Sequence, residues 1–222
     1  MTTIFFSSLV LFCTAFLFNP QKETKTIIKL PTPKFDGNVS VEKAISQRRS
    51  IRSYKKEALS IEEISQLLWA AQGITNKQGY RTAPSAGALF PLELYIAVGN
   101  VKNISPGIYK YNPNNHEIIL SISGNKRNEI AETAGGQERV RNGAVVFIFS
   151  AVYERTKTRY GTRTERYVHM EVGHAAQNVY LQVAALNMAT VSVGAFVDNE
   201  LKKAAGLAKN ESPLLLMPVG KK

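Results

Sequence analysis

Residues Gln47–Tyr54 read Gln-Arg-Arg-Ser-Ile-Arg-Ser-Tyr and crowd three arginines and two serines into one short stretch. The planar guanidinium of arginine presents a fork of donors that matches the geometry of a phosphate. Serine hydroxyls and free main-chain N–H groups can complete such an anion site. The alternative interpretation, a solvated basic patch, stays open for an isolated run of this kind.

A second stretch, Thr82–Leu94, reads Thr-Ala-Pro-Ser-Ala-Gly-Ala-Leu-Phe-Pro-Leu-Glu-Leu. Its small residues predict a loop that leads into a strand and leaves room for a flat ligand. This second stretch favours a ligand site over a solvated basic patch.

Length, composition and charge restrict the class of protein to which the chain can belong. A chain of 222 residues that is 44% hydrophobic and 20% charged predicts one globular domain, with or without an N-terminal appendage. The formal net charge is +11, but lysine and arginine are spread along the chain, without an RNA-binding signature or zinc-ligand spacing. An anionic ligand on a generally basic surface is therefore a simpler explanation than nucleic-acid or membrane-surface binding. The single cysteine, Cys13, excludes an intramolecular disulfide and a multi-cysteine metal site.

Residues 1–21 carry no charged side chain, and Ile4–Phe18 is almost wholly apolar. This run is shorter than the roughly 20 residues that a membrane-spanning helix needs. We expect an export signal or an N-terminal membrane anchor here, followed by a polar linker over residues 22–39 and one domain over residues 40–222. A misassigned start codon or a buried apolar arm are the alternatives, and either would leave the protein cytoplasmic.

Capping residues and hydrophobic periodicity predict the elements of the domain. Ser40 can cap a helix to about Arg48, and Ser60 with Glu63 forms a capping box for a helix that Gly73 ends. Further helices are expected over residues 125–133, 164–188 and 198–205, and a polar basic connection over residues 154–166. Strands are expected over residues 92–98, 107–111, 117–122, 144–152, 190–197 and 214–219.

The chain has no hydrolase nucleophile motif, no phosphate-binding P-loop, no H-E-x-x-H and no G-x-G-x-x-G. His169 and His174 are five residues apart, so they do not share one face of a helix well, and no metal site is predicted. A protein without its own nucleophile set can still catalyse when a cofactor supplies the chemistry.

From about Ser40 to Lys222 the chain resembles the FMN-dependent nitroreductase family, and within it the SagB-type dehydrogenase branch that includes azoline oxidases. The two stretches above carry the resemblance, together with Arg159-Tyr160-Gly161, Gly173-His174-Ala175-Ala176-Gln177-Asn178 and Pro218-Val219-Gly220. The resemblance implies an α+β nitroreductase-like fold, with a central, mostly antiparallel sheet flanked by helices. It also implies a homodimer that holds FMN at the subunit interface.

The resemblance also assigns site residues. Arg48, Arg49, Ser50 and Arg52 match the family's phosphate and ribityl contacts, and Lys221 a basic residue near the phosphate. Pro84, Ser85, Ala86 and Gly87 match a loop that reaches the flavin from the partner subunit, and Ser192, Val193 and Gly194 match the segment beside the isoalloxazine edge.

The azoline oxidases have a Lys-Tyr pair that is proposed to remove a proton, and the matching residues here are Arg159 and Tyr160. Arginine is effectively always protonated, so it cannot readily act as the base, whereas Tyr160 could.

The expected activity is therefore that of an FMN-dependent oxidoreductase. Hydride would pass through flavin N5 between a donor, NAD(P)H or an organic substrate, and an acceptor such as a nitro compound, a quinone or dioxygen. The alternatives are a peptide azoline dehydrogenase of the SagB type, a flavin-binding protein without turnover, and a basic membrane-surface or nucleic-acid binder.

Overall fold

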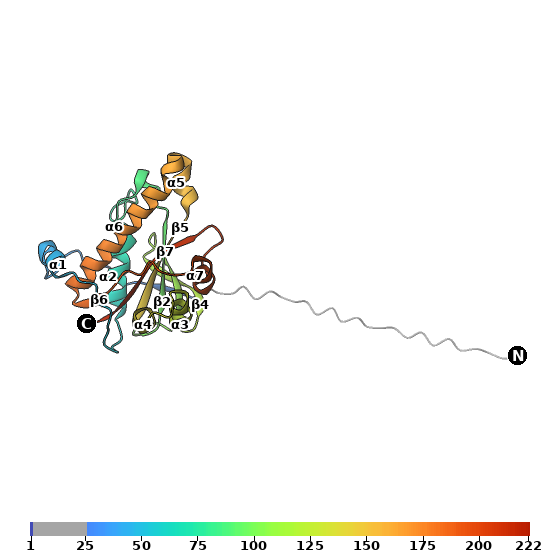
Figure 1. The fold of residues 1–222 in the computed structure, drawn as a ribbon, viewed down its shortest axis with the longest axis horizontal. Coiled ribbons are helices and arrows are strands. Elements are labelled where there is room, and N and C mark those ends of the chain that lie inside the picture. The colour runs from blue at the N-terminus through green and yellow to red at the C-terminus, as the bar shows by residue number, and fades with distance from the viewer. Residues whose placement is uncertain (2–25) are drawn as a thin grey trace.

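The computed structural model describes Met1 and residues 26–222 (Figure 1). The predicted N-terminal signal or anchor, with Cys13, lies outside the described residues. Within residues 26–222, seven strands form one sheet in the order β1-β4-β3-β2-β5-β7-β6, and every pair of neighbouring strands is antiparallel. The predicted α+β class with an antiparallel central sheet is confirmed.

The strands and helices of the described region have the following bounds. The strands are β1 (Ile27–Lys29), β2 (Leu92–Val98), β3 (Gly107–Asn112), β4 (Glu117–Ser123), β5 (Val145–Ala151), β6 (Met188–Thr190) and β7 (Ser212–Lys221). The α-helices are α1 (Val41–Gln47), α2 (Ile61–Gln72), α3 (Arg127–Thr133), α4 (Glu138–Asn142), α5 (Tyr153–Tyr160), α6 (Thr164–Ala185) and α7 (Asp198–Ala205). Two short 3₁₀ turns are η1 (Ala86–Ala88) and η2 (Gly161–Arg163).

Strand β5 is the centre of the sheet, and all of its residues are buried. Its side chains alternate between the two faces, as a strand requires. Phe147 and Phe149 belong to the core under α2 and α6, whereas Val146 and Ile148 belong to a second core under α3, α4 and α7. The continuous apolar run therefore reflects a strand that is covered on both faces.

Helices cover the two faces unequally (Figure 1). The long helix α6 crosses one face together with α2, and its first turns extend past the sheet beside α5. The short helices α3, α4 and α7 cover the other face. In the part of the chain that the structure describes, no helix combines the length and the apolar character needed to cross a membrane.

The predicted helix starts are confirmed at two capped termini. The Ser40 hydroxyl accepts the N–H of Lys43 at the start of α1. At the start of α2, Ser60 and Glu63 form the reciprocal capping box that the sequence indicated. The long helix α6 begins at the predicted residue and ends three residues earlier than predicted.

The structure differs from the prediction in four details. The strand expected over residues 190–197 is β6, Met188–Thr190, after which only Val193 pairs with the sheet, through a bridge to Leu216. The basic connection contains α5, and the polar linker contains β1. The sequence prediction also missed α4. These elements are short and held by neighbours distant in sequence, so local propensity carries little information about them.

Candidate functional site

The Tyr180 hydroxyl joins two segments that the sequence assigned to one site. The main-chain N–H of Ser192 donates to Tyr180 Oη at 2.7 Å, and Tyr180 Oη donates to Ser192 Oγ at 3.2 Å. Ser50 Oγ lies 3.2 Å from the same oxygen, and the guanidinium of Arg48 stacks over the ring at 5.3 Å from its centroid. Residues separated by some 140 positions in the sequence are thereby brought together around one hydroxyl.

This arrangement changes the acidity of Tyr180. Burial raises the pKa of Tyr180, but the hydrogen bonds from Ser192 and Ser50 and the charge of Arg48 together outweigh it, so the pKa falls below its ordinary value. The site therefore favours negative charge at this position, which is also the requirement for holding an anionic ligand.

The arginine cluster itself lies at the end of α1. Arg49 and Arg52 are exposed, and Arg48 is half-buried. Arg49 donates to the main-chain oxygens of Ser46 and Arg48, and Arg52 lies 3.4 Å from the oxygen of Ser50. Within residues 26–222, none of the three guanidinium groups pairs with a carboxylate. Their positive charge is therefore left for a ligand.

Lys221 differs from these arginines, because its ammonium pairs with the Glu63 carboxylate. The main chains of Lys221 and Lys55 also pair, with the Lys55 N–H donating to the Lys221 oxygen at 3.0 Å. The end of β7 thus lies beside the chain that follows the arginine cluster. The charge that Lys221 could offer an anion is already partly neutralised.

Ser192, Val193 and Gly194 follow β6, and Gly194 borders a groove. Val193 is buried and its main chain exchanges two hydrogen bonds with Leu216, at 2.8 and 2.9 Å. Ser192 and Gly194 on either side of it are exposed. Gly194 lines a groove of about 660 Å³ between α6, α7 and the start of β7. No heavy atom lies within 4 Å of the position where a Cβ of Gly194 would be, so a flat group can approach its main chain.

The loop Pro84–Gly87 packs against the end of α5, just before the first turns of α6. Gly87 has φ +63°, and a Cβ there would lie 2.9 Å from Tyr160 Oη and 3.0 Å from an Arg159 guanidinium nitrogen. The positive φ favours glycine here, because a residue with a side chain would strain the backbone. The Ser85 hydroxyl accepts the N–H of Phe90 at 2.9 Å and closes the loop.

The predicted residues thus form two clusters in one chain. One surrounds Tyr180, and the other brings Arg159 and Tyr160 against Gly87. Tyr160 also stacks edge-on with Tyr167 of α6, with ring centroids 4.9 Å apart. At a rise of 1.5 Å per residue, Tyr167 and Tyr180 are about 20 Å apart along α6. The predicted catalytic pair therefore does not meet the arginine cluster within one chain.

A buried carboxylate lies behind the loop. Glu171 of α6 is 3% exposed, and its Oε1 has no hydrogen-bond partner among the described residues. Burial raises the pKa of Glu171 to about 7, more than the Ser85 hydroxyl and the Arg81 guanidinium lower it. This group is therefore poised to change its protonation state near neutral pH.

Sequence reasoning missed Tyr180, Glu171 and the pair formed by Tyr153 and His169, whose Oη and Nε2 lie 2.8 Å apart. Tyr180 lies on the apolar face of a helix, where an aromatic residue is most often part of the core. His169 was weighed with His174 only as a possible metal ligand. Only the fold brings Tyr153 of α5 beside it. Within the described residues, no cluster of three or more His, Cys, Asp or Glu side chains could hold a metal ion.

Comparison with known proteins identifies the class. A model of the nitroreductase family matches residues 45–221. The chain belongs to the nitroreductase family, and the predicted resemblance is confirmed.

Individual relatives agree with this class. The chain is 46% identical to a putative nitroreductase, MJ1384 of Methanocaldococcus jannaschii, over 83% of this chain and 92% of that protein. It is 24% identical to the microcin B17-processing protein McbC of Escherichia coli, over 89% of this chain and 76% of that protein.

Solved structures share the fold. A putative nitroreductase from Ralstonia eutropha superposes with a TM-score of 0.77 at 26% identity, over 88% of this chain and 89% of that one. The NADPH:FMN oxidoreductase of Vibrio harveyi, in complex with NAD+, superposes with a TM-score of 0.59 at 21% identity, over 82% of this chain and 68% of that one.

Proposed function

We propose that this protein is an FMN-dependent oxidoreductase, which passes hydride through flavin N5 between a donor and an acceptor. The donor is NAD(P)H or an organic substrate, and the acceptor is a nitro compound, a quinone or dioxygen. The observation that carries the proposal is the Tyr180 hydroxyl, which joins Ser50 of the arginine cluster to Ser192 of the segment bordering the groove.

The residues present fit this cofactor. Arg48, Arg49 and Arg52 lack carboxylate partners among the described residues and suit a dianionic phosphate. The Ser50 hydroxyl suits a polyhydroxy chain, and the open space at Gly194 suits a flat ring. Bound FMN would supply the hydride chemistry, while the protein binds it, orients it and excludes water.

The first test removes the phosphate charges. We expect the double variant Arg48→Ala/Arg49→Ala to lose FMN on gel filtration, because each charge-assisted contact contributes roughly 1.5–3 kcal/mol. Arg163→Ala/Arg166→Ala is the matched control, since it removes two exposed arginines near the start of α6 and should retain FMN. Equal flavin content in all three proteins would show that the arginine cluster is not the phosphate site.

We also propose a homodimer. The two predicted clusters lie about 20 Å apart along α6, so a second copy would have to bring its loop to the arginines of the first. Exposed apolar side chains on α1 and α6, namely Val41, Ile45 and Met170, provide surface for such a contact. Light scattering should report twice the mass of one chain, and a monomer that retains FMN would contradict this arrangement.

Peptide azoline dehydrogenation is the second candidate. The similarity to McbC and the position of Tyr160 Oη beside the Pro84–Gly87 loop support it. Arg159 weakens it, since the guanidinium stays protonated. We expect Tyr160→Phe to abolish oxidation of a thiazoline peptide if this is the activity, while reduction by NADH or NADPH is unaffected.

A flavin-binding protein without turnover is distinguished from both by one spectrum. Anaerobic NADH and NADPH should bleach the flavin of an NAD(P)H oxidoreductase. A flavin that NADH, NADPH and a thiazoline peptide all leave oxidised would support the binding protein.

A further inference from the structure

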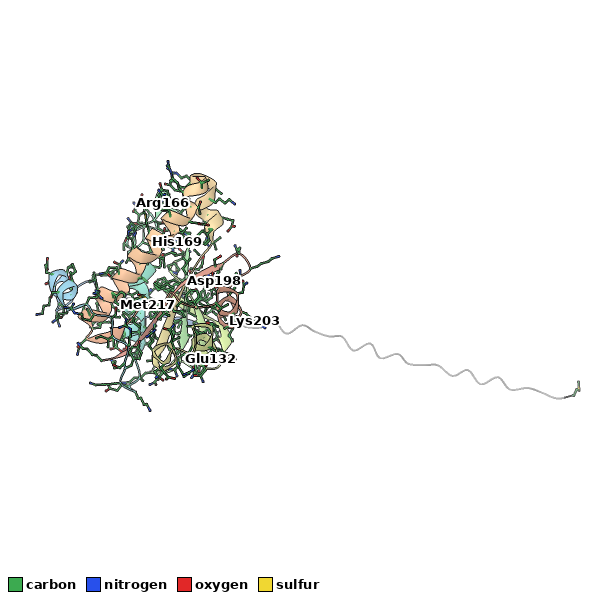
Figure 2. All side chains as sticks on the ribbon, in the orientation of Figure 1. Glu132, Arg166, His169, Asp198, Lys203 and Met217 are labelled. Atoms are coloured by element: carbon green, nitrogen blue, oxygen red, sulfur yellow. The ribbon has the colours of Figure 1, made fainter. Side chains whose placement is uncertain are left out.

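Four polar, proton-bearing or charged side chains line one side of the groove beside Gly194. Tyr153 comes from α5, Glu165 and His169 come from the first turns of α6, and Asp198 opens α7. Figure 2 shows His169 on α6 and Asp198 at the start of α7. None of these four residues belongs to the arginine cluster or to the pair that the sequence suggested as catalytic.

Tyr153 and His169 form a hydrogen-bonded pair on this side of the groove. Tyr153 Oη lies 2.8 Å from His169 Nε2, and the rings meet edge-on with centroids 6.1 Å apart. The pKa of Tyr153 is raised, mainly by burial and to a smaller extent by the negative charges of Glu165 and Asp198. The hydroxyl therefore keeps its proton at neutral pH. The pair can therefore hold a proton at the edge of the groove and pass it between oxygen and nitrogen.

The charge of the groove is opposite to that of the protein. Its lining includes Glu165 and Asp198 but no lysine or arginine, although the chain has a formal net charge of +11. Within residues 26–222 neither carboxylate forms an ion pair. A ligand that enters the groove therefore lies near two carboxylates, one from α6 and one from α7, that attract a positive charge.

Apolar surface completes the groove. Val172, Phe196 and Leu214 line it next to Gly194, whose main chain would face the flavin ring under the proposed function. A volume of about 660 Å³ lies within the range of pockets that hold small organic molecules. The lining thus combines room for a ring, a proton-exchanging pair and two unpaired carboxylates.

We propose that this groove binds the organic substrate of the oxidoreductase, selects a cationic or neutral ring over an anionic one, and uses Tyr153 with His169 as its proton-exchanging pair. The inference rests on the proposed function, because the hydride must come from or go to a bound flavin. When the substrate is reduced it gains a hydride at one atom and a proton at another atom of the same conjugated system. Tyr153 gives that proton and regains one from His169 Nε2, while His169 takes up a proton from solvent at Nδ1; substrate oxidation runs the same transfers in reverse.

The binding half of the inference is tested with three probes of one shape: benzamidinium, benzamide and benzoate. The full chain is titrated with each probe, and the amide signals of Val172 and Gly194 are followed by NMR. We expect benzamidinium to bind about tenfold more tightly than benzoate at low ionic strength, with benzamide between them and the gap shrinking as salt is added. Benzoate binding as tightly as benzamidinium, or signals that no probe moves, would overturn the inference.

Matched variants identify the source of the selectivity. Glu165→Gln/Asp198→Asn should bring the three dissociation constants to within about threefold of one another. The control Glu57→Gln removes an exposed carboxylate outside the lining and should keep the wild-type order. Selectivity that survives the double variant would mean that these carboxylates do not set it.

The proton-exchange part of the inference is tested by the rate at which the reduced flavin is reoxidised. FMN-loaded protein is reduced with dithionite and mixed with 1,4-benzoquinone in a single turnover. Tyr153→Phe and His169→Gln should slow reoxidation about 100-fold while changing the benzamidinium dissociation constant less than threefold. Unchanged rates in both variants would overturn the assignment, and Tyr109→Phe, which removes a hydroxyl outside the lining, should react as wild type.

Failure of the inference and failure of the proposed function give different results. Protein that retains FMN but shows no charge preference among the probes contradicts the groove assignment alone. Protein that cannot be loaded with FMN contradicts the proposed function, whereas the order of the three probes still decides whether the groove selects cations.

Discussion

The main-chain N–H of Ser192 donates a 2.7 Å hydrogen bond to the hydroxyl of Tyr180, and the same hydroxyl lies 3.2 Å from Ser50. A helix side chain thus fixes the segment after β6 relative to the segment after α1. The main-chain N–H of Ile51 also donates to the Thr190 oxygen at 2.9 Å, so side-chain and main-chain hydrogen bonds both join the two segments.

Tyr180→Phe should separate these two segments. We expect about tenfold weaker FMN binding, together with a loss of about 1 kcal/mol in the free energy of unfolding, because the N–H of Ser192 loses its acceptor. Fluorescence titration with FMN and urea unfolding measure the two effects. Tyr109→Phe removes the hydrogen bond to the Ser105 oxygen and should cost similar stability without changing the affinity for FMN. Equal flavin affinities in the two variants would remove Tyr180 from the site.

The ion pair between Lys221 and Glu63 predicts that Lys221 contributes less to FMN binding than Arg48 does. Lys221→Met should weaken FMN binding less than threefold, because its charge is already partly neutralised, whereas Arg48→Ala should weaken it more than tenfold. Glu63→Gln should tighten FMN binding, since it frees the ammonium while the amide can still accept the Ser60 N–H that caps α2. If Lys221→Met weakens binding as much as Arg48→Ala, Lys221 contacts the phosphate directly.

The raised pKa of Glu171 predicts a pH dependence of stability. Between about pH 4.5 and pH 7 the unfolded chain has lost this proton while the folded chain keeps it, so stability falls as the pH rises. The loss through Glu171 should be on the order of 2 kcal/mol. Urea unfolding at pH 5 and pH 8 should show this loss in the wild type and a smaller one in Glu171→Gln. Parallel pH profiles for the two proteins would contradict a buried, protonated Glu171.

A network of charged side chains that joins β2 and β3 to Glu211 predicts a large effect of one lysine. Lys110 Nζ lies 2.9 Å from Glu93 and 2.8 Å from Glu211, and the Glu211 carboxylate also accepts hydrogen bonds from Tyr95 and Ser150. Lys110→Met should lower the free energy of unfolding by on the order of 3 kcal/mol, because a 2% exposed side chain keeps an unpaired charge.

The matched double variant distinguishes charge from packing in this network. Lys110→Met/Glu211→Leu should recover part of the loss, because it removes both charges. If the double variant is no more stable than Lys110→Met, the lost packing of the lysine stem, rather than the unpaired carboxylate, accounts for the destabilisation.

The sequence supported the prediction of the fold better than that of the site. Ser60 with Glu63 and the apolar run of β5 carry strong local signals, since a cap and a buried strand depend on neighbouring residues. The short strand β6 and the helix α5 have weaker signals, because tertiary contacts decide them. The resemblance allowed the arginine cluster and the segment Ser192–Gly194 to be named as site residues. Their contact through Tyr180 could not be predicted from the sequence, because it depends on how α6 lies across the sheet.

The central position of β5 has a consequence for folding kinetics. Leu92 pairs with Ala151 on one side of it, and Val145 pairs with Val219 on the other, so both partners of β5 are distant in sequence. Long loops must close before these contacts form, which is typical of domains that fold in milliseconds to seconds rather than microseconds. Until then, the run Val-Val-Phe-Ile-Phe is a strand-forming segment without charge, and its exposure makes the refolding chain prone to self-association. Recovery of native protein after denaturation should therefore fall as the concentration during refolding rises.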